Sequence, residues 1–223
     1  MTQLRGVFAS LLIGCLFARV VAAEDPAVLL AAKDVVNANS RGGLICKGIA
    51  PDPSRADRTK LAKLITALPD PNVRYAFGYA DTTPLGLAVL ADDVELLDRL
   101  FANGARWRSD TFDSEVMYEA ARYGSPAMIK ALIRHGLSPD ARPPASWTGL
   151  MAAAWENRLD NVAVLLEAGA DAKVALPNGI SALGGAVMCR NQAMVDVLVR
   201  HGAQPDAKIK RLARDRGIQF PGS

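Results

Sequence analysis

The sequence predicts an all-α protein built as a solenoid of short helix pairs. Four apolar runs each end at a glycine, at Gly104, Gly136, Gly169 and Gly202, and the spacings between these glycines are 32, 33 and 33 residues. A period of about 33 residues with two short helices per unit is typical of a repeat architecture, because a single unit cannot bury its apolar face alone. The repeat is therefore the structural unit.

The run before each glycine predicts the second helix of a unit. Its apolar residues recur at three- and four-residue spacing, as a helix packed between two neighbours requires. These expected core positions are Leu96, Leu97, Leu100, Met128, Ile129, Leu132, Ile133, Val162, Leu165, Leu166, Met194, Val195, Leu198 and Val199. The glycine that follows is expected in the left-handed conformation that ends a helix.

The first helix of each unit opens 21 residues before the glycine, at Thr83, Glu115, Thr148 and Ser181. These segments resemble ankyrin repeats, whose first helix opens with threonine, proline, leucine, histidine, any residue and alanine. The first unit matches best, and the later units keep only the apolar third and the small sixth positions. The matching residues are Thr83, Pro84, Leu85, Ala88, Met117, Ala120, Leu150, Ala153, Leu183 and Ala186. The resemblance implies an ankyrin-repeat solenoid of helix-turn-helix units with short β-hairpin loops.

The register divides the chain into a leader, an N-terminal cap, four repeats and a closing helix. The repeats are expected at 78–109, 110–142, 143–175 and 176–208. Residues 24–77 are expected to form a helical segment and a degenerate capping repeat, with a helix from Pro26 to about Val36, a loop over 37–53 and a helix over 54–68. Ile209, Leu212 and Ala213 predict a polar-faced closing helix in 209–223, because terminal repeats need a soluble outer face.

Residues 1–23 are typical of a secretory signal peptide. Arg5 gives a positive start, an apolar stretch follows, and Ala23 ends a small-residue cleavage site. The expected location is therefore periplasmic or secreted. The apolar stretch is shorter than the roughly 20 residues of a membrane span, so an uncleaved anchor is the less favoured interpretation. A lipid anchor at Cys15 is a second alternative, which the apolar residues after Cys15 disfavour.

Charge and cysteine content bear on whether the protein binds nucleic acid, a metal ion or a cofactor. The net charge of the whole chain is +3, and loss of Arg5 and Arg19 with the leader reduces it to +1, which gives no reason to expect nucleic-acid binding. We interpret the basic run 208–216 as the solvated face of the last helix. Cys46 and Cys189 lie at opposite ends of the expected array, so they are expected to be free thiols unless the N-terminal segment folds back. Isolated cysteines and histidines predict no metal, and no cofactor is implied.

The sequence predicts no enzyme. Its best catalytic candidates are His135 and His201, but both precede a helix-ending glycine, where histidine contacts the last carbonyl groups. No carboxylate partner is expected at a matched spacing. No phosphate-binding loop, nucleophile elbow or zinc-protease helix motif is present in the sequence.

A protein-binding surface is the favoured interpretation. In the ankyrin family, partners meet the hairpins and the exposed end of the first helix, and those positions here are rich in aromatic residues, which dominate interface energetics. The candidate contact residues are Tyr79, Phe112, Arg122, Tyr123, Trp147, Trp155, Glu156, Ile180 and Met188. Alternatively, Trp155 or Phe112 fills a gap between neighbouring repeats.

The expected partner is another protein, bound through the concave face of the solenoid. By analogy, it could be a secreted toxic enzyme inhibited by an immunity protein, or an oxidative-stress enzyme such as a catalase that needs a support factor. An envelope scaffold and an enzyme that depends on His135 or His201 are further alternatives.

Overall fold

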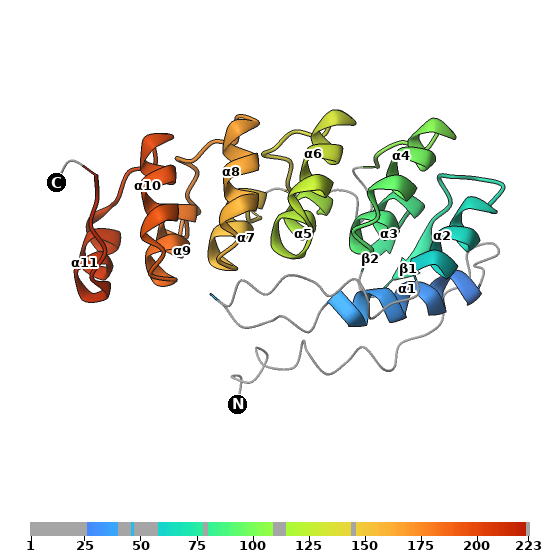
Figure 1. The fold of residues 1–223 in the computed structure, drawn as a ribbon, viewed down its shortest axis with the longest axis horizontal. Coiled ribbons are helices and arrows are strands. Elements are labelled where there is room, and N and C mark those ends of the chain that lie inside the picture. Colours follow the sequence, from blue (N-terminus) through green and yellow to red (C-terminus); the bar gives the residue numbers. More distant parts are fainter. Residues whose placement is uncertain are drawn as a thin grey trace.

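The computed structural model describes residues 26–39, 46, 58–77, 80–108, 115–143 and 146–221. Within these residues the chain is a row of helix pairs with one small β-hairpin (Figure 1). The elements are α1 (Pro26–Asn39), α2 (Arg58–Thr66), β1 (Tyr75–Phe77), β2 (Ala80–Thr82), α3 (Pro84–Leu90), α4 (Val94–Ala102), α5 (Val116–Tyr123), α6 (Pro126–Arg134), α7 (Gly149–Trp155), α8 (Leu159–Glu167), α9 (Ala182–Met188), α10 (Gln192–Arg200) and α11 (Ala207–Arg216). The predicted all-helical solenoid with short hairpins is confirmed.

The repeats stack through two layers of helices. The inner helices α3, α5, α7 and α9 pack against one another in sequence order, and the outer helices α4, α6, α8 and α10 do the same on the other side (Figure 1). We call the face formed by α3, α5, α7 and α9 the inner-helix face. Thr83, Thr148 and Ser181 cap three inner helices through their hydroxyl groups, whereas Glu115 makes no side-chain cap on α5.

The predicted core positions lie between these layers. Leu97, Ile129, Leu165 and Val195 have no exposed surface, while Ile133 and Val199 are only partly buried. The four helix-ending glycines have φ between 85° and 93°, which confirms the left-handed turn that the sequence predicted.

The N-terminal elements differ from the prediction at their ends. The first helix continues to Asn39, so Asn37 to Asn39 are helical where a loop was expected. The helix expected over 54–68 spans Arg58–Thr66, and residues 54–57 lie outside the described part. Tyr75 pairs with Thr82 in the β1–β2 hairpin, and α1 packs against α2 and α3 with Val28, Ala31 and Ala32 buried.

The loop between the inner and outer helices of a repeat carries a second left-handed position. Asp92, Asn157 and Arg190 occupy it in the first, third and fourth repeats, with φ of 52°, 58° and 54°. Asp92 accepts from the Ser125 backbone N–H at 2.9 Å, and Asn157 accepts from the Asn191 amide at 2.7 Å. These bonds join each loop to the next repeat.

Helix α11 closes the array as expected. It packs against α9 and buries Ile209 and Ala213, while the charged side chains of its opposite face are mostly exposed. Gly217 ends the helix in the left-handed conformation, with φ of 71°. Among the described residues, every helix is too short or too polar to cross a membrane.

Candidate protein-binding surface

Two of the predicted contact residues form an aromatic pair at the third repeat. Trp147 lies just before α7 and Trp155 ends it, and their ring centroids are 5.5 Å apart. Both side chains are partly exposed. Because large rigid aromatic groups bury much area at little entropic cost, this pair has the chemistry of an interface anchor.

Trp155 also packs between the third and fourth repeats. Its indole Nε1 donates to the Ser181 carbonyl at 3.1 Å, and its ring lies so close to Gly185 that an added Cβ would be 2.6 Å from Cδ1. The gap-filling interpretation therefore holds for part of this side chain. The exposed remainder and Trp147 form the accessible surface.

Arg122 and Glu156, predicted as partner contacts, bind each other. The Arg122 Nε donates to Glu156 Oε1 at 2.8 Å, which joins α5 to the residue that follows α7. Arg122 also donates to the Tyr118 hydroxyl at 3.2 Å, and its guanidinium lies 4.6 Å from the Tyr123 ring centroid. Burial raises the pKa of Tyr123 to about 12. This cluster presents aromatic surface with its charges paired.

Glu119 lies one residue from Tyr118 on α5 and was not among the predicted contacts. Burial raises the pKa of its carboxyl group to about 7, and the nearby Arg122 only partly opposes this effect. A carboxyl group of this kind changes charge near neutral pH. The sequence could have indicated Glu119, because it lies three residues before Arg122 and so on the same side of the helix.

The remaining predicted contact residues are Ile180, Met188, Tyr79 and Phe112, and the structure describes only the first two. Ile180 is partly buried in the hairpin before α9, where its N–H donates to the Asn178 side chain and its carbonyl accepts from Leu176. Met188 is partly exposed at the end of α9 and accepts two bonds from Arg216. Tyr79 and Phe112 lie outside the described residues.

The expectation of two free thiols is wrong. Cys46 and Cys189 form a disulfide with their Cα atoms 4.9 Å apart, across a sequence separation of 143 residues. The Cys46 N–H also donates to the Trp155 carbonyl at 3.1 Å. Cys46, which follows α1 in the sequence, therefore lies at the ends of α7 and α9. Folding back of the N-terminal segment is the one arrangement that was expected to bring the two cysteines together.

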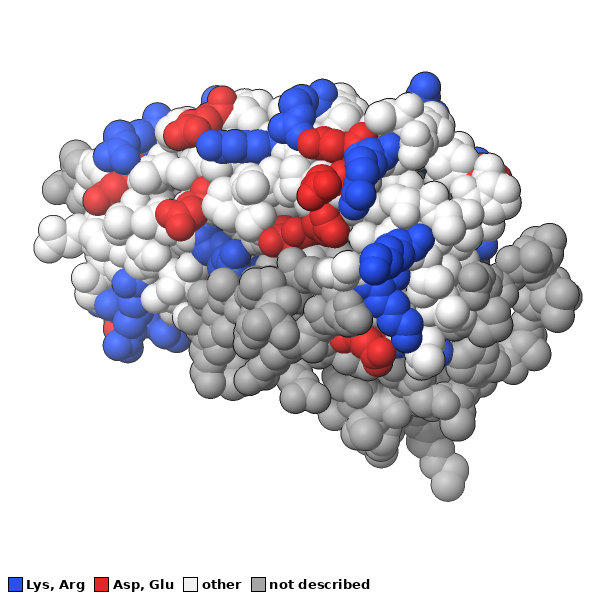
Figure 2. Space-filling view, turned by 45° about the vertical axis from the view of Figure 1, so that its right-hand side comes forward, with Lys and Arg blue, Asp and Glu red and all other residues white. Residues whose placement is uncertain are grey.

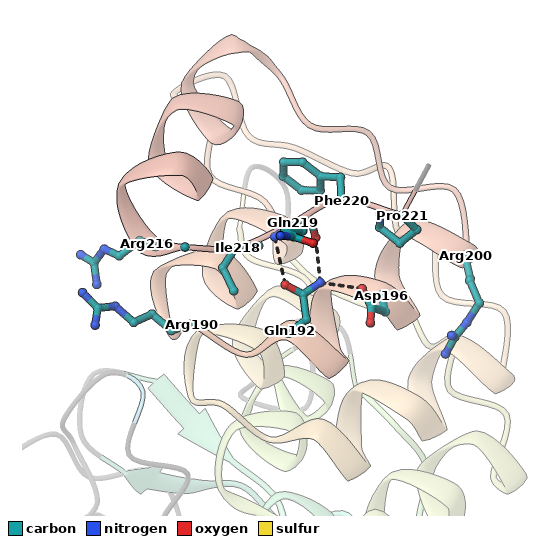
Figure 3. Close-up of a pocket in the computed structure, with 10 residues that line it drawn as sticks. Arg190, Gln192, Asp196, Arg200, Arg216, Ile218, Gln219, Phe220 and Pro221 are labelled. Carbon is teal, nitrogen blue, oxygen red and sulfur yellow. Dashed lines mark hydrogen bonds between the residues drawn. The ribbon is translucent and has the colours of Figure 1, made fainter. Parts of the chain in front are cut away.

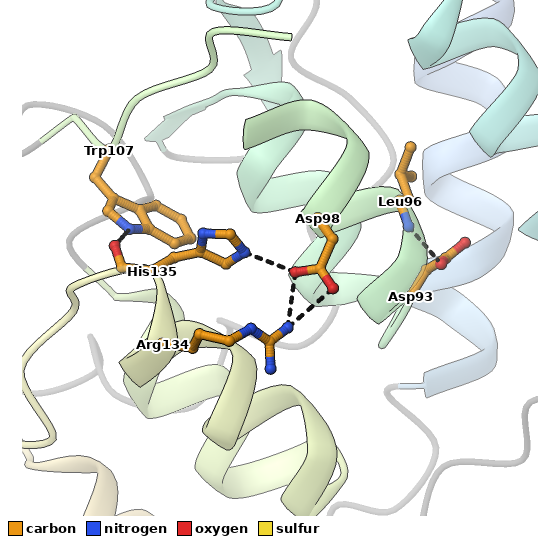
Figure 4. A network of polar contacts seen from close by, with 6 residues as sticks. All are labelled: Asp93, Leu96, Asp98, Trp107, Arg134 and His135. Atoms are coloured by element: carbon orange, nitrogen blue, oxygen red, sulfur yellow. Dashed lines mark hydrogen bonds and ion pairs between the residues drawn. The ribbon is translucent and has the colours of Figure 1, made fainter. Parts of the chain in front are cut away.

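His135 and His201 occupy equivalent positions but have different partners. His201 Nδ1 lies 2.9 Å from the Val197 carbonyl of its own helix, the helix-end contact that the sequence predicted. His135 Nε2 lies 2.6 Å from Asp98 Oδ1, so the expectation of no carboxylate partner is wrong for this residue (Figure 4). Asp98 lies on α4, the outer helix of the repeat before His135, six residues before Gly104. In the repeat before His201 the same position, six residues before Gly169, is Ala163, which cannot pair with a histidine.

The contacts of His135 are those of a structural residue. Its ring stacks on Phe101 at 3.9 Å, and its carbonyl accepts from Trp107 Nε1. Arg134 donates to both oxygens of Asp98, at 2.8 and 2.9 Å (Figure 4). The hydrogen bond to His135 and the bonds and charge of Arg134 lower the pKa of Asp98. Over the described residues, no group of His, Cys, Asp and Glu is arranged to hold a metal ion.

Comparison with known proteins agrees with this architecture. A family model described as ankyrin repeats, in three copies, matches residues 85–175, which contain the helix pairs of the first three repeats. No curated protein is similar enough in sequence to be reported as a relative. Ankyrin repeats are protein–protein interaction modules and are generally not enzymes. Residues 85–175 therefore match the ankyrin repeat family, which supports the resemblance found in the sequence.

Proposed function

We propose that this protein acts outside the cytoplasm, in the periplasm or after secretion, and binds one partner protein through the inner-helix face. The observation that carries the proposal is the Trp147 and Trp155 pair, which is partly exposed beside the Arg122 and Tyr123 cluster. Tryptophan, tyrosine and arginine are the residue types most enriched among interface hot spots.

The disulfide supports an extracytoplasmic location. Disulfides persist in oxidising compartments and are rare in the cytosol of mesophiles. Cys46 and Cys189 are joined in the folded chain, and residues 1–23 have the pattern of a cleavable export signal. The two observations come from different parts of the chain and favour the same compartment.

The pairing of Arg122 with Glu156 limits what the partner contributes here. Both charges are already compensated, and the Glu156 side chain is only 12% exposed. A partner that displaced either group would leave the other buried and unpaired, at considerable cost. We therefore expect apolar and aromatic contacts at this part of the surface, with polar contacts at its rim.

The test is a capture experiment with residues 24–223 as bait and an envelope extract as the source of partner. We expect a single protein to be recovered, and its amount to fall at least about tenfold with Trp147→Ala, a typical hot-spot loss of about 1.4 kcal/mol. Trp107→Ala is the matched control, because Trp107 packs on Phe101 and bonds to His135 away from the aromatic pair.

The readout is quantitative mass spectrometry, with circular dichroism to check helical content. Equal loss of the protein with Trp107→Ala and Trp147→Ala would contradict the proposed surface. Recovery of many envelope proteins would instead favour a scaffold. A tight complex with a toxic enzyme or with a catalase would distinguish an inhibitor from a support factor.

A further inference from the structure

Positive charge is concentrated at the C-terminal end of the solenoid. Residues 190–223 contain seven basic and three acidic side chains, a net charge of +4, whereas residues 24–189 contain 17 basic and 20 acidic side chains, a net charge of −3. On the face shown in Figure 2, acidic and basic side chains are interspersed over the repeats. The last part of the sequence, which forms α10 and α11, is therefore the cationic part of the chain.

An open hollow of about 870 Å³ lies at this end, between α10 and the chain that follows α11. Gln192 fixes one wall, because its amide donates to the Gln219 carbonyl and to Asp196, both at 2.7 Å, and its oxygen accepts from the Gln219 N–H at 3.0 Å (Figure 3). Arg190, Arg200 and Arg216 line the hollow, and Asp196 is its one acidic lining residue among the described part of the chain.

Arg190 and Arg216 extend from the same rim of this hollow, and their guanidinium groups point the same way (Figure 3). Arg216 is fixed by two bonds of 3.2 Å from its Nη atoms to the Met188 carbonyl and sulfur. These acceptors are uncharged, so within the described residues no acidic group pairs with Arg216. Arg200 lies apart, beyond Asp196 (Figure 3).

The backbone at Arg190 is strained. Its φ of 54° is left-handed, and the equivalent positions in the first and third repeats are Asp92 and Asn157, residues that tolerate this conformation. A residue other than glycine, asparagine or aspartate is sterically disfavoured in this conformation. Such strain is typical of positions where the side chain itself has a role.

Neither arginine has an anionic partner in the described chain. The ion pairs among the described residues lie in the earlier repeats, where acidic residues bind Arg99, Arg122, Arg134 and His135. A carboxylate accepts two parallel hydrogen bonds from a guanidinium group, and such charge-assisted bonds are roughly twice as strong as neutral ones. Two adjacent unpaired guanidinium groups therefore favour a shared anion.

We propose that Arg190 and Arg216 form a carboxylate clamp that binds an acidic segment of a partner protein at the C-terminal end of the inner-helix face. Arg216 reaches this face because it is bonded to Met188, the residue before the disulfide-linked Cys189. The inference extends the proposed function: the aromatic pair supplies apolar contacts, and the clamp selects a partner that is acidic on one side. We assign the anion to a protein carboxylate and not to a lipid phosphate because two of the three arginines lie together on one rim, whereas Arg200 lies apart beyond Asp196 (Figure 3).

The test uses a fluorescent polyglutamate peptide as probe, with anisotropy as the readout, at low salt and at about 150 mM salt, where the Debye length is about 8 Å. We expect Arg190→Gln with Arg216→Gln to weaken binding at least about tenfold, because the variant removes both charge-assisted contacts. The matched control, Lys208→Gln with Lys210→Gln, removes the same charge from exposed positions of α11 and should weaken binding less than about threefold, as expected for a screened exposed charge.

Loss of the Arg216 bonds could disturb α11, so Arg190→Gln alone is tested as well. The Arg190 side chain is exposed, and its one bond among the described residues is from the backbone N–H to the Val187 carbonyl. Equal weakening by the clamp and control variants would overturn the proposal in favour of diffuse charge. Failure of the peptide to bind, or tighter binding to anionic phosphatidylglycerol vesicles, would also overturn it.

The same assay separates this proposal from the proposed function. Trp147→Ala should leave peptide affinity unchanged, because Trp147 lies at the third repeat, whereas Arg190 lies in the fourth repeat and Arg216 on α11. If the peptide fails to bind while Trp147-dependent partner capture persists, the clamp alone is wrong. If capture does not depend on Trp147 while the clamp binds peptide, the aromatic surface is wrong.

Discussion

The junction between the third and fourth repeats and the junction between the first and second repeats are held by different interactions. At the third–fourth junction, Trp155 packs on Gly185 and bonds to Ser181, and the Cys46–Cys189 disulfide lies beside it. At the first–second junction, Asp98 binds Arg134 and His135 on a partly exposed surface. The interactions described at the third–fourth junction are thus a disulfide and apolar packing, and those at the first–second junction are ion pairs.

This difference matters because stability in a solenoid is approximately a sum of repeat and nearest-neighbour terms. Buried apolar contacts and a disulfide contribute several kcal/mol each, whereas exposed ion pairs contribute at most about 1 kcal/mol. We therefore expect the C-terminal repeats to be the more stable part. The candidate binding surface is built on them.

Removal of the disulfide should have the largest effect on this comparison. Cys46→Ser with Cys189→Ser should lower the free energy of unfolding by about 3 kcal/mol, because the cross-link restricts the unfolded chain over a long loop. Urea unfolding with and without reductant measures this loss. Hydrogen exchange should show faster opening of α7 and α9 than of α3.

The double variant is its own control, since a reductant should no longer change its stability. A wild-type protein that is equally stable with and without reductant would contradict the prediction. Faster exchange confined to α3 and α4 would mean that the disulfide does not stabilise the third–fourth junction.

Loss of the Trp155 ring should have the next largest effect. Trp155→Ala removes the packing on Gly185 and Trp147 and the bond to Ser181, and we expect a loss of about 3 kcal/mol in thermal or urea unfolding. Trp107→Ala at the first–second junction should cost about 1 kcal/mol, because its ring is in a more open site beside exposed charges. Similar losses at the two tryptophans would remove the proposed difference between the junctions.

A pH-dependent effect is expected at Glu119 on α5, in the second repeat. The folded protein raises the pKa of Glu119 from 4.5 to about 7, so the folded state favours the protonated carboxyl group. The stability that this gives is complete below the unfolded pKa and is lost as pH rises through about 7. Glu119→Gln should therefore unfold like wild type near pH 4 and be more stable by on the order of 2 kcal/mol near pH 8.

Urea unfolding at several pH values measures this difference. Glu95→Gln is the control, because Glu95 is exposed on α4 with 81% of its side-chain surface accessible. A constant difference between Glu119→Gln and wild type from pH 4 to pH 8 would show that Glu119 does not titrate in this range.

The sequence predicted the repeats better than the contacts between distant segments. Period and apolar spacing depend on residues within one unit, so the helix pairs, the glycine turns and cores such as Leu97 and Ile129 were confirmed. The Cys46–Cys189 bond depends on the path of the chain after α1, and no local pattern encodes it. The separation of 143 residues lies beyond any periodic signal.

The candidate site shows the same division. The register placed Trp147 and Trp155 near each other, but it could not show that Gly185 leaves room for the Trp155 ring. It also predicted Arg122 and Glu156 as contacts for a partner protein, although these residues, 34 positions apart, bind each other between the second and third repeats. Pairing between repeats needs both the register and the side-chain directions, and the sequence supplies only the register.

The smallest expected effect concerns Asp98. Its pKa is lowered, first by the bond to His135 and also by Arg134, so the stability that it contributes is present above its ordinary pKa and is lost as pH falls through the lowered value. Because 43% of the Asp98 side chain is exposed, solvent screens the ion pairs. Asp98→Asn should therefore lower the free energy of unfolding near pH 7 by no more than about 0.5 kcal/mol.

The difference between Asp98→Asn and wild type should shrink with added salt and disappear in strong acid. His201→Gln is the matched comparison, because His201 bonds to its own helix carbonyl and not to a carboxylate, so its small effect should not depend on salt. A loss above about 2 kcal/mol at Asp98 would exceed what an exposed pair provides. It would mean that the stacked Phe101 and His135 rings depend on this carboxylate, and the first–second junction would then be as cooperative as the third–fourth.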